Sequence, residues 1–426
     1  MFRKSLVLFF GLFIFASCGF VIASQNNEKK NSFPYPLALF GIRQTGSSGE
    51  ASGGGTGTSI PPAPSGLNYT NSSYAFLQGS VITSLTPTLN GTPTSCSSNP
   101  PLPTGLSLNN TTCVISGTPT NWQAATSHTI TATNSGGNTT ANINIQVTSD
   151  GSSWTSRTMP SSQNWTSVTF GNGLFVAVSS GGNVAATSPD GITWTARTLP
   201  SSASWSAVTF GNGIFLAVAS SSNNAATSPN GITWTARTLP SVSGWVAVGY
   251  GNGIFVALGG GAVASSPDSI IWTSGTNGCP MMAGNCSESV AHGNGVFVGI
   301  GNGGISSSNG SNWTYLTTPI SGMIGVAFGN GSFVAMDTGI GTTTSTDGIN
   351  WVTGTNVIAG QDNLAFGNGI FLSVIRNTNT AISSPDAVTW TTRTLPSNSE
   401  WSSVAYGNGR FVTIARGPSN IAASSP

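Results

Sequence analysis

Short runs of alternating hydrophobic and polar residues fill most of the chain from residue 149 onward. The stretch from Trp165 to Pro200 shows the pattern best. There Val168 and Phe170 alternate with polar neighbours, and an apolar run over 174–178 follows Asn172-Gly173. A period of two is typical of strands, and Asn-Gly between two such runs is the strongest short hairpin signal. The pattern therefore predicts antiparallel strands and no helix.

Two further turns complete this unit. A polar turn is expected at 179–183, and Ser188-Pro189-Asp190-Gly191 turns the chain into a fourth strand that begins near Trp194. The unit then recurs, because a Gly-Asn-Gly signature returns at intervals of about forty residues, with its first Gly at 171, 211, 251, 293, 329, 367 and 407. Seven four-stranded units of about forty residues predict an all-β, seven-bladed β-propeller over 149–426.

The two ends of the repeat region predict how the ring closes. The segment from Ser149 to Trp154 reads as the second half of a unit without its first half. The residues 422–426 stop where the last copy still needs a fourth strand. We therefore expect the segment near Trp154 to supply the outer strand of the seventh blade, which leaves no unpaired inner edge.

The preceding segment, 62–148, is also all-β in pattern, with short strands such as 129–133 and 141–147. Its run Leu102-Pro103-Thr104-Gly105-Leu106-Ser107-Leu108, followed by Val114-Ile115-Ser116-Gly117-Thr118-Pro119, resembles the putative Ig domain (He_PIG) family of bacterial surface proteins. Cys113 stands where that family usually has Gly. The resemblance implies an Ig-like β-sandwich that acts as a spacer or adhesion module, without catalytic residues.

The N-terminal residues predict export. Residues 1–17 carry Arg3 and Lys4 before a short apolar run, as a signal peptide does. The residues around Cys18, Phe-Ala-Ser-Cys-Gly, resemble a bacterial lipobox, which implies that Cys18 is lipidated and anchors the chain in the bacterial cell envelope, at the outer membrane or cell surface. The alternatives are ordinary cleavage near Ala23 and an uncleaved anchor. Residues 18–61 are then a flexible, Gly- and Ser-rich tether.

Composition and cysteine count fit an exported protein. Only 5% of the residues are charged and the net charge is +1, which gives no electrostatic footprint for nucleic acid. With Cys18 set aside, the other cysteines form two close pairs, and each pair is expected to form a disulfide: Cys96 with Cys113, and Cys279 with Cys286. A metal site is the weaker alternative, because neither pair has CxxC spacing and the chain has only two His residues.

One turn of each repeat carries an acidic or amide residue. The turns Ser188–Trp194 and Ser345–Trp351 resemble the Asp-box of sialidase-like and photosystem-assembly-factor-like propellers, where the box is structural. The resemblance implies that the side chain accepts backbone N–H groups and that the Trp packs between blades. The corresponding positions are Asp150, Asp190, Asn230, Asp268, Asn309, Asp347 and Asp386. Asn replaces the acid in two copies, and Ser269 and Ala387 replace the following Gly.

Catalysis is not expected. A sialidase would need an arginine cluster, a Tyr-Glu pair and an acid/base Asp in the central mouth. The inner strands carry neither Arg nor a carboxylate, and no arginine cluster accompanies Glu288, Asp362 and Glu400, which lie just before inner strands. His292 occupies the slot that Phe or Tyr fills in other copies, so we interpret it as an aromatic substitute. The expectation is no catalytic residue, no cofactor and no metal.

Two surfaces are candidates for binding. One is an arc of arginines on the outermost strands of four consecutive blades, for which edge protection is the competing interpretation: Arg157, Arg197, Arg237 and Arg393. The other is the end of the ring with the second-to-third turns and the links between blades, which vary among copies. The sequence thus predicts a non-enzymatic binding or adhesion scaffold for a protein or glycan. A periplasmic assembly factor and a sialidase-like hydrolase are the alternatives.

Overall fold

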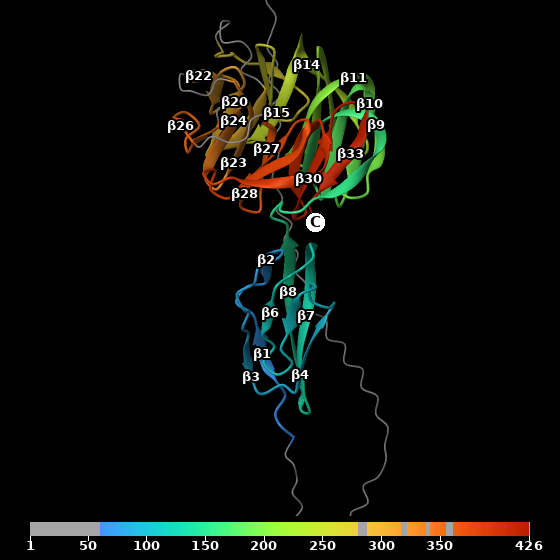
Figure 1. Ribbon diagram of the computed structural model, residues 1–426, viewed down its shortest axis with the longest axis vertical. Coiled ribbons are helices and arrows are strands. Elements are labelled where there is room, and N and C mark those ends of the chain that lie inside the picture. Colours follow the sequence, from blue (N-terminus) through green and yellow to red (C-terminus); the bar gives the residue numbers. More distant parts are fainter. Residues whose placement is uncertain (1–59, 280–287, 317–321, 338–340, 355–360, 426) are drawn as a thin grey trace, which may run out of the picture. The chain divides into compact units, whose positions relative to one another are not determined.

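The computed structural model describes residues 60–279, 288–316, 322–337, 341–354 and 361–425. Every regular element in these residues is a β-strand (Figure 1). A search of the same residues for a helix long and apolar enough to cross a membrane finds none. The signal peptide, Cys18 and almost all of the tether lie outside the described residues, so export and lipidation stay predictions.

The segment with the Ig-like pattern forms a β-sandwich. One side is a four-stranded sheet in which β2 runs parallel to β8, while the other pairs are antiparallel: β2 (Ser73–Leu77), β8 (Gly137–Thr148), β7 (Gln123–Asn134) and β4 (Ser95–Asn99). Against it lie two short pairs, β1 (Ser65–Asn68) with β3 (Thr88–Asn90) and β5 (Leu106–Leu108) with β6 (Ile115–Gly117). Their alternate side chains, among them the fully buried Ile115, Ile130 and Ile145, form one core.

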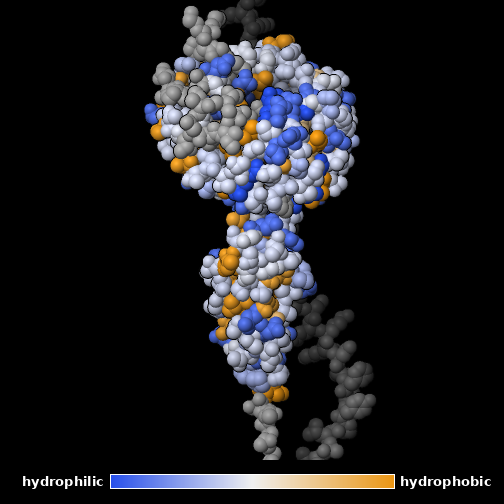
Figure 2. Space-filling model, viewed as in Figure 1, coloured by the Kyte–Doolittle hydropathy of each residue, from blue (hydrophilic) through white to orange (hydrophobic). Residues whose placement is uncertain are grey.

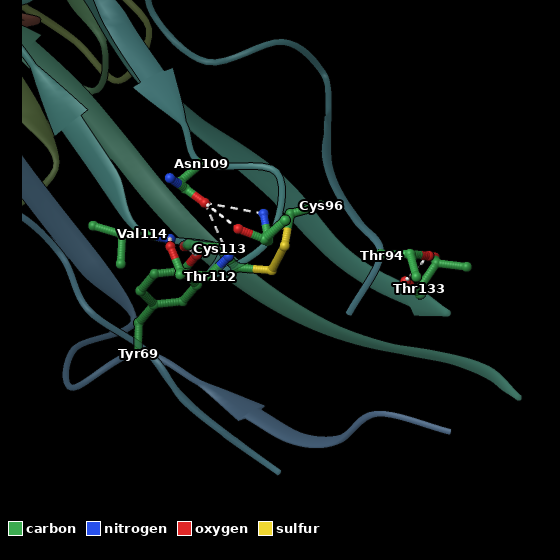
Figure 3. The surroundings of a disulfide bond; sticks show 9 residues. Tyr69, Thr94, Cys96, Asn109, Thr112, Cys113, Val114 and Thr133 are labelled. Atoms are coloured by element: carbon green, nitrogen blue, oxygen red, sulfur yellow. Dashed lines mark hydrogen bonds between the residues drawn. A yellow bond between two sulfur atoms is a disulfide. The ribbon is translucent and has the colours of Figure 1, made fainter. Parts of the chain in front are cut away.

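A disulfide joins β4 to the loop before β6. Cys96 and Cys113 are bonded, as their spacing predicts, with Cα atoms 5.4 Å apart (Figure 3). Cys113 has a φ of +54°, in the left-handed region that glycine adopts most easily, so a Gly is the expected alternative at this position. The side-chain oxygen of Asn109 accepts two backbone N–H groups of the same loop, at 2.9 and 3.0 Å. Cys279 is also disulfide-bonded; Cys286, its predicted partner, lies outside the described residues.

The repeat region forms a seven-bladed propeller, which confirms the predicted fold class. Four blades are separate antiparallel four-stranded sheets. The third has β15 (Trp245–Gly251), β16 (Ile254–Gly259), β17 (Ala262–Ser266) and β18 (Thr273–Ser274); the fourth has β19 (Ser289–Gly293), β20 (Val296–Ile300), β21 (Gly304–Ser307) and β22 (Thr314–Leu316). The fifth has β23 (Met323–Gly329), β24 (Ser332–Asp337), β25 (Thr342–Ser345) and β26 (Val352–Thr353); the sixth has β27 (Gln361–Gly367), β28 (Ile370–Ile375), β29 (Thr378–Ser384) and β30 (Thr391–Ser399).

The other three blades share one nine-stranded sheet, because two long strands pass from one blade to the next. These are β9 (Thr155–Gly171) and β11 (Thr195–Gly211). The first blade contains β10 (Leu174–Ser188), and the second contains β12 (Ile214–Ser220), β13 (Ser222–Ser228) and β14 (Thr235–Ser243). The seventh contains β31 (Trp401–Gly407), β32 (Arg410–Ala415) and β33 (Ser419–Ser424). In each blade the first strand is innermost and touches the first strands of both neighbouring blades.

One predicted turn is shorter than expected. The sequence suggests a polar turn over 179–183, but β10 continues through these residues, pairing with β9 up to Ser180 and with β11 from Ser180 onward. The change of direction falls at Gly181, whose φ is +89°. Its counterpart in the second blade is Ser221, at a φ of +58°. A single left-handed residue is enough for the turn, so the flanking polar residues stay in the strand.

The seventh blade takes its outer strand from the beginning of the propeller. β33 pairs antiparallel with the first part of β9, with Ala422 opposite Arg157 and Ser424 opposite Thr155. The two ends of the propeller segment are therefore hydrogen-bonded to each other. Pairing across the chain ends removes the exposed edge that an open ring would have.

The core of the ring lies between blades. Trp194 of the first blade is 7% exposed and packs in one cluster with Phe175 of that blade and Val412 and Ile414 of the seventh. The cluster between the first and second blades is similar, with Val176 of the first blade and Phe215 and the partly buried Trp234 of the second. Each blade therefore needs its neighbours to bury its apolar face, which is typical of propellers.

Candidate functional site

The two ends of the ring differ, and we name them by their turns. The uniform end carries the Gly-Asn-Gly turns and the turns that begin at Ser188 and its counterparts. The variable end carries the second-to-third turns and the links between blades. Each inner strand begins at the variable end and reaches its Gly-Asn-Gly turn at the uniform end, as β15 does from Trp245 to Gly251.

At the uniform end, each Asn of a Gly-Asn-Gly turn adopts a left-handed conformation with a φ between 46° and 51°. Most of these side chains donate to backbone carbonyls of the next blade. Asn330 donates to Gly369 at 3.1 Å and to Pro385 at 2.9 Å. Asn408 of the seventh blade donates to Pro189 of the first at 2.7 Å, which closes the circle. This amide belt explains why Asn precedes the second Gly in every copy.

The first Gly of each signature is needed for a close contact. A Cβ on Gly211 would lie 2.1 Å from the ring of Tyr250 in the next blade, and the other six copies are equally tight. His292 fills the same slot, lying over Gly251, with its ring centroid 4.6 Å from that of Phe297. Its Nε2 is buried without a hydrogen-bond partner, and burial lowers the pKa of the His292 side chain. These contacts support an aromatic packing role.

The acidic and amide turn residues also bind the backbone of their own turns. In six of the seven turns the side-chain Oδ1 accepts two backbone N–H groups, at 2.7 to 3.0 Å: Asp190, Asn230, Asp268, Asn309, Asp347 and Asp386. Hydrogen bonds from Asn350 and Ile349 hold the pKa of Asp347 well below its usual range. The Oδ1 acceptor of each of these six residues is thus used within its own turn. Ser269 and Ala387 keep the left-handed φ of the Gly that they replace, at 62° and 59°.

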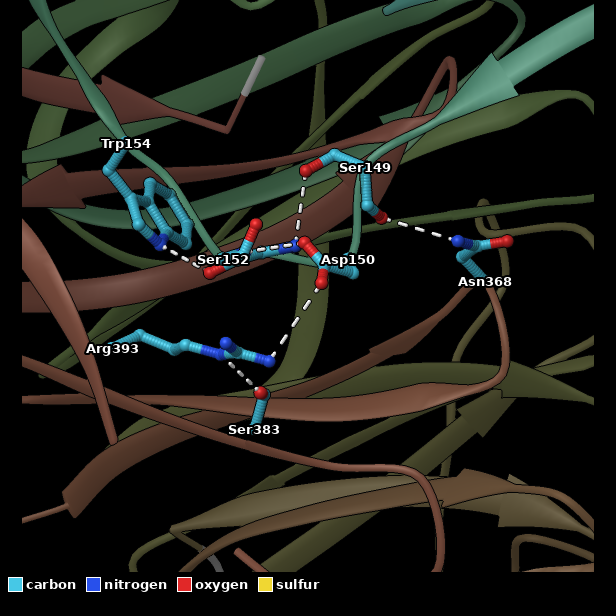
Figure 4. A network of polar contacts seen from close by, with 8 residues as sticks. Ser149, Asp150, Ser152, Trp154, Asn368, Ser383 and Arg393 are labelled. Atoms are coloured by element: carbon cyan, nitrogen blue, oxygen red, sulfur yellow. Dashed lines mark hydrogen bonds and ion pairs between the residues drawn. The ribbon is translucent and has the colours of Figure 1, made fainter. Parts of the chain in front are cut away.

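Asp150 departs from this pattern. Its Oδ1 accepts one backbone N–H, from Ser152 at 2.8 Å, and its Oδ2 lies 3.9 Å from Nη2 of Arg393 in the sixth blade (Figure 4). Asn368 of the sixth blade donates to the Ser149 carbonyl at 3.3 Å. The segment that begins the propeller is therefore tied to the sixth blade as well as to β33.

The last hairpin of the uniform end contacts the sandwich. Trp122 donates its indole N–H to the Asn408 carbonyl at 2.8 Å, and the N–H of Ser149, the first residue after the sandwich, donates to the Gly409 carbonyl at 2.7 Å. The guanidinium of Arg410 lies 3.8 Å above the Trp122 ring. Arg410 is 3% exposed, and burial lowers its pKa to about 10. The sequence analysis missed this contact; the signal was Arg410, which stands where the other copies have Leu, Ile, Val or Ser.

The four arginines of the outer arc are held by their own blades. In each case Nε donates to a hydroxyl of the neighbouring third strand at 2.8 to 3.0 Å, for Arg157, Arg197, Arg237 and Arg393. Figure 2 shows a hydrophilic band over the region where Figure 1 places β30 and β33. Each of the four arginines thus makes the same type of hydrogen bond within its own blade, which is the geometry expected for protection of a sheet edge.

A cavity of about 400 Å³ opens on the axis at the variable end. All seven inner strands line it with residues from the part of the strand nearest the variable end. Among these residues are Thr166, Ser206, Val246, Ser289, Ile324, Asn363 and Ser402. Three charged residues join them: Glu288, Arg376 and Arg416. A second hollow of about 310 Å³ shares Thr166, Ser206, Glu288 and Arg416 with it. The described residues hold no group of three or more His, Cys, Asp or Glu that could bind a metal.

This cavity corrects one expectation. The sequence suggested that no arginine cluster accompanies Glu288, because the inner strands carry no Arg. Arg376 and Arg416 come instead from the residues just after β28 and β32, at the second-to-third turns. The alignment of the repeats contains a signal for this placement. Arg376 and Arg416 stand at the position that Ser180 and Ser220 occupy in the first and second blades, and this position is at the variable end. The side chain of Asp362 lies outside the described part of the structure.

The fold thus defines a seven-bladed propeller with a polar cavity on its axis, preceded by a β-sandwich. Residues 56–149 match the family model of the putative Ig domain. The propeller is similar to virginiamycin B lyase from Staphylococcus aureus, with a TM-score of 0.56 and 13% identity over 64% of this chain and 98% of that one. It is also similar to the WD40 propeller domain of Doa1, with a TM-score of 0.51 and 11% identity over 65% of this chain and 96% of that one.

A third similar structure is YCF48 bound to D1 peptide, with a TM-score of 0.50 and 15% identity over 64% of this chain and 96% of that one. At such identities the likeness shows the fold alone. No curated protein sequence matches this chain.

Proposed function

We propose that this chain is an exported, lipid-anchored protein of the bacterial cell envelope that binds a protein or glycan through the variable end of its propeller, without catalysis. The observation that carries the proposal is the axial cavity, to which every blade contributes. The Asn side chains and aromatic rings at the uniform end contact neighbouring blades in copy after copy, whereas the side chains at the variable end differ from copy to copy. Variable side chains on a rigid scaffold are the usual arrangement of a binding surface.

The lining of the cavity supports binding over hydrolysis. A glycosidase places two carboxyl groups, or a Tyr with its Glu, on either side of the scissile bond. Among the described lining residues the carboxylate is Glu288 alone. One of the similar propellers is a lyase, so an enzyme is the second candidate function. It is tested by assaying release of product from envelope glycans, and measurable turnover that Glu288→Gln abolishes would establish it.

A binding screen tests the choice of end. The full chain is screened against envelope proteins and glycans, together with two variants of equal charge change. Asn379→Arg alters an exposed residue at the variable end, and Ile232→Arg alters an exposed residue at the uniform end. We expect the first to reduce binding to every hit at least tenfold and the second to leave it unchanged. The reverse result would assign recognition to the uniform end, whose turns expose Ile or Val in several blades.

The anchor and the location are tested in cells. Palmitate labelling of the native protein that disappears in Cys18→Ala would support lipidation. An unlabelled native protein would contradict it.

Protease treatment of intact cells separates surface display from the periplasmic alternative. Cleavage of the full chain supports the surface assignment. Protection until the outer membrane is permeabilised supports an assembly factor instead.

A further inference from the structure

We infer that the axial cavity binds a compact ligand through a carboxylate group, with Arg416 as the principal contact and Arg376 beside it. This inference deepens the proposed function, because it names the chemistry that the variable end recognises. It rests on how Arg416 is held, on the hydroxyl groups of the lining and on the charge of the cavity.

Arg416 is held differently from the arginines of the outer arc. All four of those use Nε in a hydrogen bond to a Ser or Thr of their own blade. Nε of Arg416 is buried and has no hydrogen-bond partner, although the residue lines both hollows at the variable end. A buried donor without an acceptor is unfavourable, because it has lost its hydrogen bonds to water. The Arg416 guanidinium can therefore donate to an acceptor on a bound ligand. A carboxylate suits it best, because its two oxygens can accept two parallel N–H bonds from one guanidinium.

The hydroxyl groups of the lining are of two kinds. Those of Thr166, Ser206 and Ser402 donate to carbonyls of their own and the next blade, so their lone pairs remain as acceptors. Those of Ser167 and Ser403 accept a backbone N–H of the next blade at 3.1 Å. The protons of this second kind remain available to donate. The cavity therefore suits a ligand that has hydroxyl or amide groups besides its acid.

The charge of the lining favours a monoanion. Arg376 and Arg416 contribute two positive charges and Glu288 one negative charge, so the described charged residues that line the cavity sum to +1. A carboxylate neutralises this charge. A phosphate dianion would exceed it and would leave a net negative charge in the cavity beside Glu288. A volume of about 400 Å³ lies in the range of small-molecule sites, about 300 to 1,000 Å³.

Two sources supply such a carboxylate: an acidic sugar and the C-terminal end of a peptide. The experiment therefore uses two matched pairs of probes on the full chain, measured by calorimetry at low and at physiological salt. One pair is galacturonate and galactose. The other is N-acetyl-trialanine and its C-terminal amide. We expect the acid of one pair to bind at least tenfold more tightly than its neutral partner, and the pair that responds identifies the source.

Variants test the residue. Arg416→Ser installs the residue that the first and second blades carry at this position, so the repeat tolerates it. We expect it to weaken binding of the acid tenfold to a hundredfold, about 1.4 to 2.7 kcal/mol, and Arg376→Ser to weaken it less. The matched control is Arg237→Ser, which removes the same charge from the outer arc and should leave affinity unchanged. Thermal unfolding verifies that each variant is folded.

Three outcomes would overturn the inference: neither acid binds, the neutral partners bind equally well, or Arg416→Ser binds as tightly as the native chain. These outcomes are separable from failure of the proposed function. If Asn379→Arg still abolishes binding of a protein or glycan hit while Arg416→Ser does not, the variable end is the binding surface and the carboxylate site is wrong.

Discussion

The two ends of the propeller use the same strands for different purposes. At the uniform end, Asn side chains bind the next blade, glycines admit aromatic rings, and acidic residues bind their own turns. At the variable end, the same strands begin with side chains that differ from blade to blade and converge on a cavity. The contrast teaches that repetition in this sequence marks what holds the ring together, whereas departures from repetition mark what the ring can bind.

The largest effect is expected from the glycine contact at the uniform end. Gly211→Ala would place a Cβ about 2.1 Å from the Tyr250 ring, so the two blades must separate or the ring must leave its slot. We expect a loss of roughly 3 kcal/mol in the free energy of unfolding, measured by chemical denaturation.

The matched control lies at the variable end. Gly182 has open space around its position for a Cβ and no left-handed φ. We expect Gly182→Ala to change stability by less than about 0.5 kcal/mol. Equal losses for the two variants would mean that the ends do not differ as described.

A smaller effect is expected from the acidic turn. Asp347 accepts the backbone N–H groups of Ile349 and Asn350 at 2.9 and 2.8 Å. Because these are solvent-exposed bonds, we expect Asp347→Ala to cost about 1 kcal/mol. Asp347→Asn keeps the acceptor, as Asn230 and Asn309 do in other copies, and should be nearly neutral at pH 7.

The pH dependence tests the same turn. The pKa of Asp347 is lowered by hydrogen bonds from Asn350 and Ile349, so the ionised carboxylate contributes stability that is present above the unfolded value, about 3.9. That contribution is lost as pH falls below about 4. Asp347→Asn should show a shallower loss on acidification than the native chain, and an unchanged acid profile would count against the role of the carboxylate.

The smallest effect concerns His292. Burial lowers its pKa, so the unfolded chain binds a proton more readily and the native chain loses stability as pH falls below about 6.5. His292→Phe restores the Phe or Tyr ring of the other copies. The free energy of unfolding of this variant should change less between pH 8 and 5 than that of the native chain. A slope in that window that persists in the variant would show that another group is responsible.

Much of the fold could be predicted because its signals are local. Asn-Gly pairs mark hairpins wherever they occur, and the interval between them gives the length of a blade. The pairing of β33 with β9 also follows from local pattern, because a half unit at one end of the repeat meets a missing strand at the other. Gly181 shows the limit of such reasoning: a run of polar residues was expected to turn, but one left-handed residue does so within the strand.

The candidate site was harder to predict because its parts are far apart in the chain. Arg376 and Arg416 were overlooked in the sequence because they follow the second strands of their blades and lie outside the inner strands. Likewise, Trp122 and Arg410 give no local sign that they stack on each other. Such contacts depend on the closed ring, which brings turns of separate blades around one axis and one hairpin against the sandwich.

By itself the sequence determined the number of blades, the order of their strands and the chemistry of their turns, because hydrophobic period and turn residues act over a few neighbouring positions. Tertiary structure alone decided which side chains meet. It placed one aromatic ring on each glycine of the preceding blade, and it gathered Glu288, Arg376 and Arg416 into one cavity. The physical reason is ring closure, which fixes distances between residues that no local pattern relates.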